Sequence, residues 1–382
     1  MKNAIIHVSA TPKSTLTLTV APPRMAMLRA SSRRVLASAR RLSSQSLPHP
    51  SPPPAVTIIE VGPRDGLQSE TSHVPTLLKL NLINMLIDAG HTRIEATSFV
   101  SPKWIPQFKD ANEVMAALPA DSPVEFSVLT PNLKGVQNAL SHPSTDVASV
   151  FGAASESFSQ KNINCSIDES IERFRAVVDH ANERSKPVRG YISCVAGCPF
   201  QGAVDPNDVI HVYAKMREMG IEEISLGDTI GVGTPTQISR LLTSLISLEG
   251  SADHIALHCH DTYGSSLANI LRGLDHGVTR IDASVAGLGG CPYAGGGATG
   301  NVATEDVVYM LHGMGVETGL DLERLVWAGR EVTEFLGIET RSKAGGALWK
   351  RMVKEGRVSD EGRPDFVTDA APSAGVSKSR VV

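Results

Sequence analysis

The stretch EEISLGDTIGVGTPTQISRLLTSLISLEGSADHIALHCHD, residues 222–261, decides the fold class. It opens with a short strand-like run at 222–227, continues through a helical pattern at 235–249, and closes with a second strand-like run at 254–260. A strand, a helix and a strand in this order predict two parallel strands joined by a helical crossover. We therefore expect an α/β fold around this unit.

The same alternation extends in both directions from this unit. Eight strand-like runs precede or follow eight helical patterns, and the whole spans about 230 residues, which predicts a (β/α)8 TIM barrel. A doubly wound open sheet is the alternative, because periodicity does not prove that a sheet closes. The expected strands are 56–61, 93–98, 124–129, 146–151, 188–195, 222–227, 254–260 and 280–287; the expected helices are 75–89, 110–118, 132–140, 167–185, 206–219, 235–249, 264–276 and 303–314.

The two ends of the chain differ from this middle part. We expect the catalytic barrel over 55–318, a helical extension over 319–356 and a polar, disordered tail over 357–382. Residues 1–54 are expected to be a disordered mitochondrial transit peptide that ends in a Pro-rich linker, because 25–50 is rich in Arg and Ser and free of acidic residues. This address predicts the mitochondrial matrix; the alternative is a basic tail on a cytosolic protein.

Charge and composition exclude several classes of protein. The first 59 residues carry eight basic and no acidic side chains, so the rest holds 28 of the 36 Lys and Arg against all 40 Asp and Glu, a formal charge of −12. An acidic body with only 4% aromatic residues argues against a nucleic-acid partner. No run of 18 apolar residues occurs, so no membrane span is expected. Five scattered cysteines do not make a disulfide framework.

Polar residues with reactive side chains gather where the predicted strands end. In a barrel of parallel strands these ends meet at one rim, which is where the active site lies. The candidates, from the first strand to the loop after the eighth, are Arg64, Asp65, Glu95, Asp228, His258, His260, Cys291 and Asn301.

His258 and His260 lie two apart in an extended run, so both side chains face the same way, with Cα atoms about 6.6 Å apart. Such a pair can bind one metal ion, while Cys259 between them faces the helices. Asp65 and Asn301 would add oxygen donors. Because no thiolate cluster accompanies this set, we expect Mg²⁺ or Mn²⁺ with open coordination positions in place of a closed zinc site.

Two further residues have two readings each from spacing alone. Arg64 lies in Pro-Arg-Asp-Gly, which forms a plain turn as readily as it places a guanidinium on a carboxylate or an oxyanion. Cys291 is either a buried inert residue or, in its glycine-rich loop beside the metal residues, a thiol that exchanges protons. The loop reads GLGGCPYAGGGATGN over 287–301.

Together these segments resemble the 3-hydroxy-3-methylglutaryl-CoA lyase family over about 56–345. The motifs that carry the resemblance are EVGPRDGLQ (60–68), IEATSFVSPKWIPQ (94–107), HCHDTYG (258–264) and VAGLGGCPYA (285–294). It implies a carbon–carbon lyase whose acyl-CoA thioester substrate, 3-hydroxy-3-methylglutaryl-CoA, is cleaved to acetyl-CoA and acetoacetate in leucine degradation and ketogenesis. It also implies a homodimer.

The resemblance also implies a role for each candidate. Asp65, His258, His260 and Asn301 would hold the divalent cation, and Arg64 would bind the substrate and stabilise the enolate. Cys291 would be the catalytic thiol, with Asp65 or His258 accepting a proton, and Glu95 and Asp228 would support the site. This chain departs from the family pattern in one extra residue after CPYA, and it has no cysteine after Cys291, whereas animal relatives carry one close to the C-terminus.

Three other functions compete with the lyase. A related synthase that condenses acetyl-CoA with a 2-oxo acid would share the barrel, the aspartate and the histidine pair, but generally lacks the GLGGCPYA loop. A non-catalytic binding protein would not need the metal residues and Cys291 together. A nucleic-acid-binding protein conflicts with the charge of −12.

Overall fold

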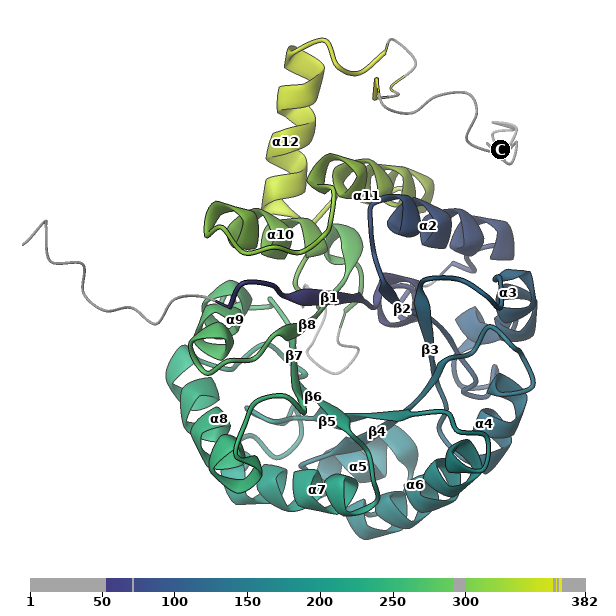
Figure 1. The fold of residues 1–382 in the computed structure, drawn as a ribbon, viewed down its shortest axis with the longest axis vertical. Coiled ribbons are helices and arrows are strands. Elements are labelled where there is room, and N and C mark those ends of the chain that lie inside the picture. Colours follow the sequence, from purple (N-terminus) through teal and green to yellow (C-terminus); the bar gives the residue numbers. More distant parts are fainter. Residues whose placement is uncertain (1–52, 71, 291–299, 360–361, 363, 366–382) are drawn as a thin grey trace, which may run out of the picture. The chain divides into compact units, whose positions relative to one another are not determined.

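The computed structural model describes residues 53–70, 72–290, 300–359, 362 and 364–365. Within them, parallel strands form a closed barrel in the order of the chain (Figure 1). The strands are β1 (Thr57–Glu60), β2 (Arg93–Ser98), β3 (Glu125–Leu129), β4 (Val147–Ala153), β5 (Val188–Ser193), β6 (Glu223–Asp228), β7 (Ile255–Cys259) and β8 (Arg280–Ala283).

The pairing of β1 with β8 closes the barrel. Ile58 lies opposite Ile281, and Glu60 opposite Ala283, in a parallel ladder of four residue pairs. An open sheet would leave both of these strands with an unpaired edge. The predicted (β/α)8 barrel is therefore confirmed, and the doubly wound alternative is wrong.

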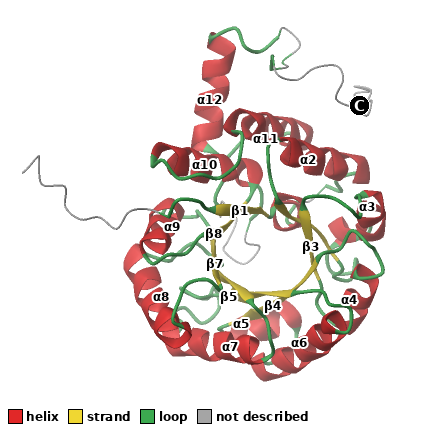
Figure 2. Ribbon diagram, viewed as in Figure 1, coloured by secondary structure: helices red, strands yellow, loops and turns green. Residues whose placement is uncertain are grey.

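The predicted helices recur with ends shifted by a few residues, and they surround the barrel (Figure 2). They are α2 (Thr76–Asp88), α3 (Ala111–Ala117), α4 (Leu133–Ala139), α6 (Ile167–Asn182), α7 (Pro206–Glu218), α8 (Pro235–Glu249), α9 (Ser266–Asp275) and α10 (Thr304–Gly313). Helix α5 (Glu156–Ile163) was not predicted. It begins where the Ser155 side chain accepts the amide of Phe158 at 3.1 Å, and ends at Asn164 with φ of 51°.

The two faces of each strand have different surroundings. On β7, Ile255, Leu257 and Cys259 belong to the apolar core between strands and helices. The alternate residues His258 and His260 are buried among polar side chains inside the barrel. Cys259 therefore faces the helices, as predicted, and the barrel interior is left for the polar residues of the site.

The expected helical extension contains α11 (Leu322–Leu336) and α12 (Lys343–Lys354). Helix α11 packs against α2 and α12, on the side of the barrel where β1 and β8 meet (Figure 1). Arg357, just after α12, forms an ion pair with Glu323 of α11, with Nη1 and Oε1 2.7 Å apart. Most of the expected tail and nearly all of the expected transit peptide lie outside the described residues. No helix in the described part is long and apolar enough to cross a bilayer.

Candidate active site

A single buried turn places Arg64 and Asp65 at the end of β1. The segment Gly62–Gly66 forms one π-helical turn, η1, in which the amides of Asp65 and Gly66 donate to the carbonyl of Val61 at 2.7 and 3.1 Å. A Cβ at Gly62 would lie 2.6 Å from the Glu60 carboxylate, so this position needs glycine. The turn is buried, and its Arg64 and Asp65 side chains contact Glu95 and His258.

Arg64 is held between two carboxylates. Its Nε donates to Oε2 of Glu95 on β2 at 2.6 Å, and its Nη1 to Oδ1 of Asp65 at 2.5 Å. Burial opposes the charged guanidinium, but the two carboxylates outweigh it and raise the pKa of Arg64. A fixed cation therefore lies at the rim of the barrel, 6% exposed.

The two histidines at the end of β7 face each other and Asp65. The Nε2 atoms of His258 and His260 are 3.2 Å apart, and Nε2 of His258 is 3.7 Å from Oδ2 of Asp65. Burial, together with the neighbouring His258, lowers the pKa of His260 to about 3. His260 is therefore neutral at physiological pH, which is the form that binds metals.

Asn301 completes this group from the segment after β8. Its backbone pairs with that of His260 in an isolated bridge, and its Nδ2 donates to Oδ2 of Asp65 at 2.8 Å. The other oxygen of Asp65, Oδ1, accepts from Arg64 and Gln68. Burial raises the pKa of Asp65, but Arg64 and the histidines outweigh it and lower that pKa. The carboxylate is therefore ionised.

These residues fit a divalent cation. One ligand atom from each of Asp65, His258 and His260 can be chosen so that all lie within 4.8 Å of one another, and all three residues are buried. The Nδ1 atom of His260 has no hydrogen-bond partner among the described residues. Two imidazoles, a carboxylate and an amide suit a cation that takes nitrogen and oxygen ligands.

The sequence did not identify Asp282, Arg189 and Tyr191, which connect the two halves of the site. Asp282 of β8 lies 3.3 Å from Nδ1 of His258 and accepts from Nη2 of Arg189 at 2.6 Å. On β5, Nη1 of Arg189 donates to the hydroxyl of Tyr191 at 2.5 Å, and this hydroxyl donates to Oε2 of Glu95 at 3.0 Å. A continuous chain of buried contacts therefore runs from His258 to the carboxylate that holds Arg64.

Asp282 sets the orientation of His258. Burial opposes its charge, but Arg189 and His258 outweigh burial and lower its pKa, so it is a carboxylate that accepts a hydrogen bond from Nδ1–H of His258. The Nε2 atom of His258 then carries the free lone pair toward Asp65 and His260. The sequence signal was present as polar residues at alternate, barrel-facing positions of VRGYIS and RIDA.

We expect Asp282→Asn to weaken Mn²⁺ binding by about 10- to 100-fold, because an amide no longer fixes the imidazole in the ligand orientation. Titration of the metal-free protein with Mn²⁺, followed by calorimetry, measures this change. Ser225→Ala is the matched control: it removes the 2.7 Å hydrogen bond to Oδ2 of Asp282 and keeps the carboxylate. An Asp282→Asn variant with unchanged Mn²⁺ affinity would contradict the assignment.

Two predicted site residues, Asp228 and Cys291, are not among the residues that contact one another at this rim in the described part of the chain. Asp228 ends β6 and accepts the amides of Val232 and Gly233 at 3.1 and 2.8 Å, so it shapes the following loop. These hydrogen bonds lower the pKa of Asp228, but burial outweighs them and raises it to about 6. In the described part of the chain, Asp228 has no hydrogen bond or ion pair to Asp65, His258 or His260. Cys291 lies outside the described residues.

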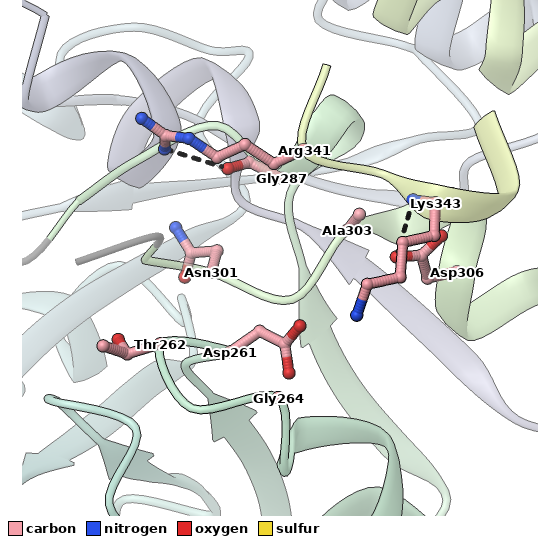
Figure 3. A pocket seen from close by; sticks show the side chains of 9 residues that line it. All are labelled: Asp261, Thr262, Gly264, Gly287, Asn301, Ala303, Asp306, Arg341 and Lys343. Atoms are coloured by element: carbon pink, nitrogen blue, oxygen red, sulfur yellow. Dashed lines mark hydrogen bonds between the residues drawn. The ribbon is translucent and has the colours of Figure 1, made fainter. Parts of the chain in front are cut away.

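A cavity of about 250 Å³ adjoins Asn301 (Figure 3). It lies between the loop after β7, the segment after β8 and the start of α12, and its charged lining residues are Asp261, Asp306, Arg341 and Lys343. Two cations and two carboxylates balance in charge. Among the lining residues, Asn301 hydrogen-bonds to Asp65.

Curated relatives resemble this chain over most of its length. It is 53% identical over 303 residues to the mitochondrial hydroxymethylglutaryl-CoA lyase of Arabidopsis thaliana, with 79% of this chain and 64% of that protein covered. It is 54% identical over 295 residues to the mitochondrial lyase of Gallus gallus, with 77% of this chain and 98% of that protein covered. It is 50% identical over 305 residues to the cytoplasmic 3-hydroxy-3-methylglutaryl-CoA lyase of Mus musculus, with 80% of this chain and 88% of that protein covered. The chain thus spans just under two thirds of the plant protein and nearly all of the chicken one.

Solved structures and a family model agree with this similarity. A hydroxymethylglutaryl-CoA lyase from Pseudomonas aeruginosa superposes with a TM-score of 0.76 at 48% identity, covering 79% of this chain and 99% of that one. An HMG-CoA lyase from Acinetobacter baumannii, in complex with coenzyme A and 3-methylmalate, gives 0.72 at 35% identity, with 80% and 96% covered. The family model described as HMGL-like matches residues 55–332. The chain therefore belongs to the hydroxymethylglutaryl-CoA lyase family.

Proposed function

We propose that this protein cleaves 3-hydroxy-3-methylglutaryl-CoA to acetyl-CoA and acetoacetate. The observation that carries the proposal is the buried Arg64 beside the Asp65–His258–His260 group at one rim of the barrel. A cation site and a fixed guanidinium in contact with it suit a substrate that has both a carboxylate and a thioester carbonyl.

Asp65, His258, His260 and Asn301 would hold the divalent cation, for which Mg²⁺ and Mn²⁺ are the candidates. When bound, a cation of this kind acts as a Lewis acid that lowers the pKa of the C3 hydroxyl and orients the substrate. The side chains supply what remains: a base for the hydroxyl proton, a donor for the thioester oxygen, and an acid for the carbon left behind.

The proton and electron movements follow from these positions. Asp65 accepts the proton of the C3 hydroxyl, because Nδ1 of His258 donates to Asp282 and its Nε2 would bind the cation, and the C3–O bond becomes the carbonyl of acetoacetate. The C2–C3 bond breaks, and its electron pair moves into the thioester as an enolate. Arg64, whose charge is fixed by Glu95 and Asp65, donates hydrogen bonds to the enolate oxygen. Protonation of C2 then gives acetyl-CoA.

Cys291 is our candidate for the acid that protonates C2. Its neighbour Gly290 is described, and the carbonyl of Gly290 accepts from the hydroxyl of Ser69 at 2.8 Å. At the other end of the loop, a Cβ on Gly300 would collide with the backbone of Gly289. Both ends of the loop therefore meet beside Asn301, which supports a role for Cys291 at this rim.

A lyase assay tests the proposed function. Purified protein with Mg²⁺ or Mn²⁺ should release acetoacetate from 3-hydroxy-3-methylglutaryl-CoA, and excess chelator should abolish the release. Acetyl-CoA with 2-oxo acids serves as the competing reaction. Release of free CoA from that mixture, without acetoacetate from the first substrate, would replace the lyase with a condensing synthase.

We expect Cys291→Ser to lose at least about 100-fold in kcat, because a hydroxyl is a far weaker acid than a thiol and general acid catalysis contributes roughly 10²- to 10⁴-fold. Mn²⁺ affinity should stay within about 2-fold of wild type. Cys198→Ser is the matched control, since that buried cysteine accepts from Ser155 and packs in a separate apolar cluster with Ala153 and Phe158. Full activity of Cys291→Ser would remove Cys291 from the mechanism.

The cellular setting is also part of the proposal. An acid-free, Arg-rich start and two of the three relatives described above support the mitochondrial matrix, whereas the mouse relative carries a cytoplasmic name. Imaging of the full chain fused to a fluorescent protein, against a fusion that starts at residue 55, separates the two locations. The family resemblance supports a homodimer, which light scattering of the purified protein tests.

A further inference from the structure

Residues 285–289, here called the strap, connect β8 to the loop that contains Cys291. Their backbone is held by side chains from several parts of the fold. Oε1 of Glu60 accepts the amide of Val285 at 2.9 Å, and Glu305 of α10 accepts the amide of Ala286 at 2.9 and 3.0 Å. Ala286 has a φ of 57°, a left-handed conformation that these contacts maintain.

Arg341 holds the carbonyl side of the strap from outside the barrel. It lies between α11 and α12, and its backbone amide donates to the carbonyl of Ala286 at 3.0 Å. Its Nη1 donates to the carbonyl of Gly287 at 3.3 Å and also to that of Gly289 (Figure 3 shows the first). One guanidinium thus joins two carbonyls that lie on either side of Leu288.

The carbonyl of Leu288 contacts Asn301, one of the proposed cation ligands. It accepts from Nδ2 of Asn301 at 3.1 Å, and the same nitrogen donates to Oδ2 of Asp65 at 2.8 Å. Both protons of the amide are therefore engaged, and its oxygen Oδ1 is the atom that can bind a cation. The position of the strap sets the orientation of this amide.

We propose that Arg341 is a positioning residue for the cation site, acting through the strap on Asn301. This inference rests on the proposed assignment of Asn301 as a ligand, and it gives the helical extension a part in the site. Without the guanidinium, the carbonyls of Gly287 and Gly289 lose a shared donor. The Leu288 carbonyl between them is then free to shift, and the amide of Asn301 loses one of its two anchors.

A double-mutant cycle with Mn²⁺ binding as the readout tests the proposal. We expect Arg341→Gln to weaken Mn²⁺ binding by about 10-fold in the wild-type background, as for other residues that orient metal ligands. In an Asn301→Ala background the same change should have less than about 2-fold effect, because the anchored amide is already gone. Arg341→Lys, whose ammonium lacks the planar fork, should lie between wild type and Arg341→Gln.

The controls separate positioning from loss of charge or of folding. Arg330→Gln removes a guanidinium from an exposed site on α11, 3.5 Å from Glu334, and should leave Mn²⁺ affinity unchanged. Thermal unfolding of each metal-free variant checks the fold. An unchanged Mn²⁺ affinity in Arg341→Gln overturns the proposal, and so does an equal loss in both backgrounds. Since the cycle measures binding alone, its outcome does not depend on whether the lyase assay releases acetoacetate.

Discussion

His260→Ala is expected to lose bound metal and, with it, at least about 100-fold in lyase activity. The Nε2 of His260 lies 3.2 Å from that of His258, and the pKa of His260, lowered to about 3 by burial and by His258, keeps it a neutral ligand. Removing a ligand should cost more than the roughly 10- to 100-fold typical of a residue that only orients one. Metal content after dialysis, measured by mass spectrometry, and Mn²⁺ titration report the change.

The matched control for this variant is Cys259→Ala on the same strand. Cys259 is the residue before His260, but it faces the apolar core between β7 and the helices. Its truncation removes one buried sulfur and leaves the barrel interior untouched, so metal content should equal that of wild type. If His260→Ala retains full metal content, His260 leaves the ligand set and the nitrogen ligand must be His258 alone.

The parts of this site that the sequence predicted are those with a local pattern. His258 and His260 are two apart on one strand, and period-two alternation alone turns them to the same side. The order of strands and helices, from 56 to 314, predicted the barrel, and the barrel then placed the ends of β1 and β7 at one rim. This placed Asp65 beside the histidines, whereas spacing alone left Arg64 with two readings.

The parts that were missed depend on contacts between distant segments. Asp282 meets Arg189 across 93 positions of sequence, and Tyr191 meets Glu95 across 96. No spacing rule encodes such pairs, because the closure of the barrel decides which inward side chains touch. The π-helical turn η1 was also beyond prediction, since its buried conformation depends on the Glu60 carboxylate accepting the amide of Gly62 at 2.8 Å.

The proposed substrate is an anionic thioester, whereas residues 60–382 carry a formal charge of −12. The carboxylates nearest the site are each committed: Asp282 to Arg189 and His258, Glu95 to Arg64 and Tyr191. Their charges are balanced by neighbouring groups, so the negative net charge of residues 60–382 does not determine the electrostatic potential at the rim of the barrel. We therefore expect the proposed substrate to be attracted by Arg64 and by the cation that the histidines would hold.

Arg64→Gln is expected to lower kcat by about 100- to 1,000-fold, the loss typical of one oxyanion donor, while Mn²⁺ affinity stays the same or increases. The reason for the second expectation is Asp65, whose Oδ1 is 2.5 Å from the Arg64 guanidinium. Without this positive charge, the negative charge of Asp65 is no longer partly neutralised and attracts the cation more strongly. Steady-state kinetics at saturating Mn²⁺, together with Mn²⁺ titration, separate the two effects.

The same substitution leaves Glu95 as a buried carboxylate that has lost its cation, which by itself destabilises the fold. The double variant Arg64→Gln/Glu95→Gln removes that charge and isolates the catalytic loss. Its thermal stability should rise above that of Arg64→Gln, while kcat should stay low because the donor to the enolate is still missing. Recovery of kcat in the double variant would show that Arg64 serves only to neutralise Glu95, and would exclude it from stabilising the enolate.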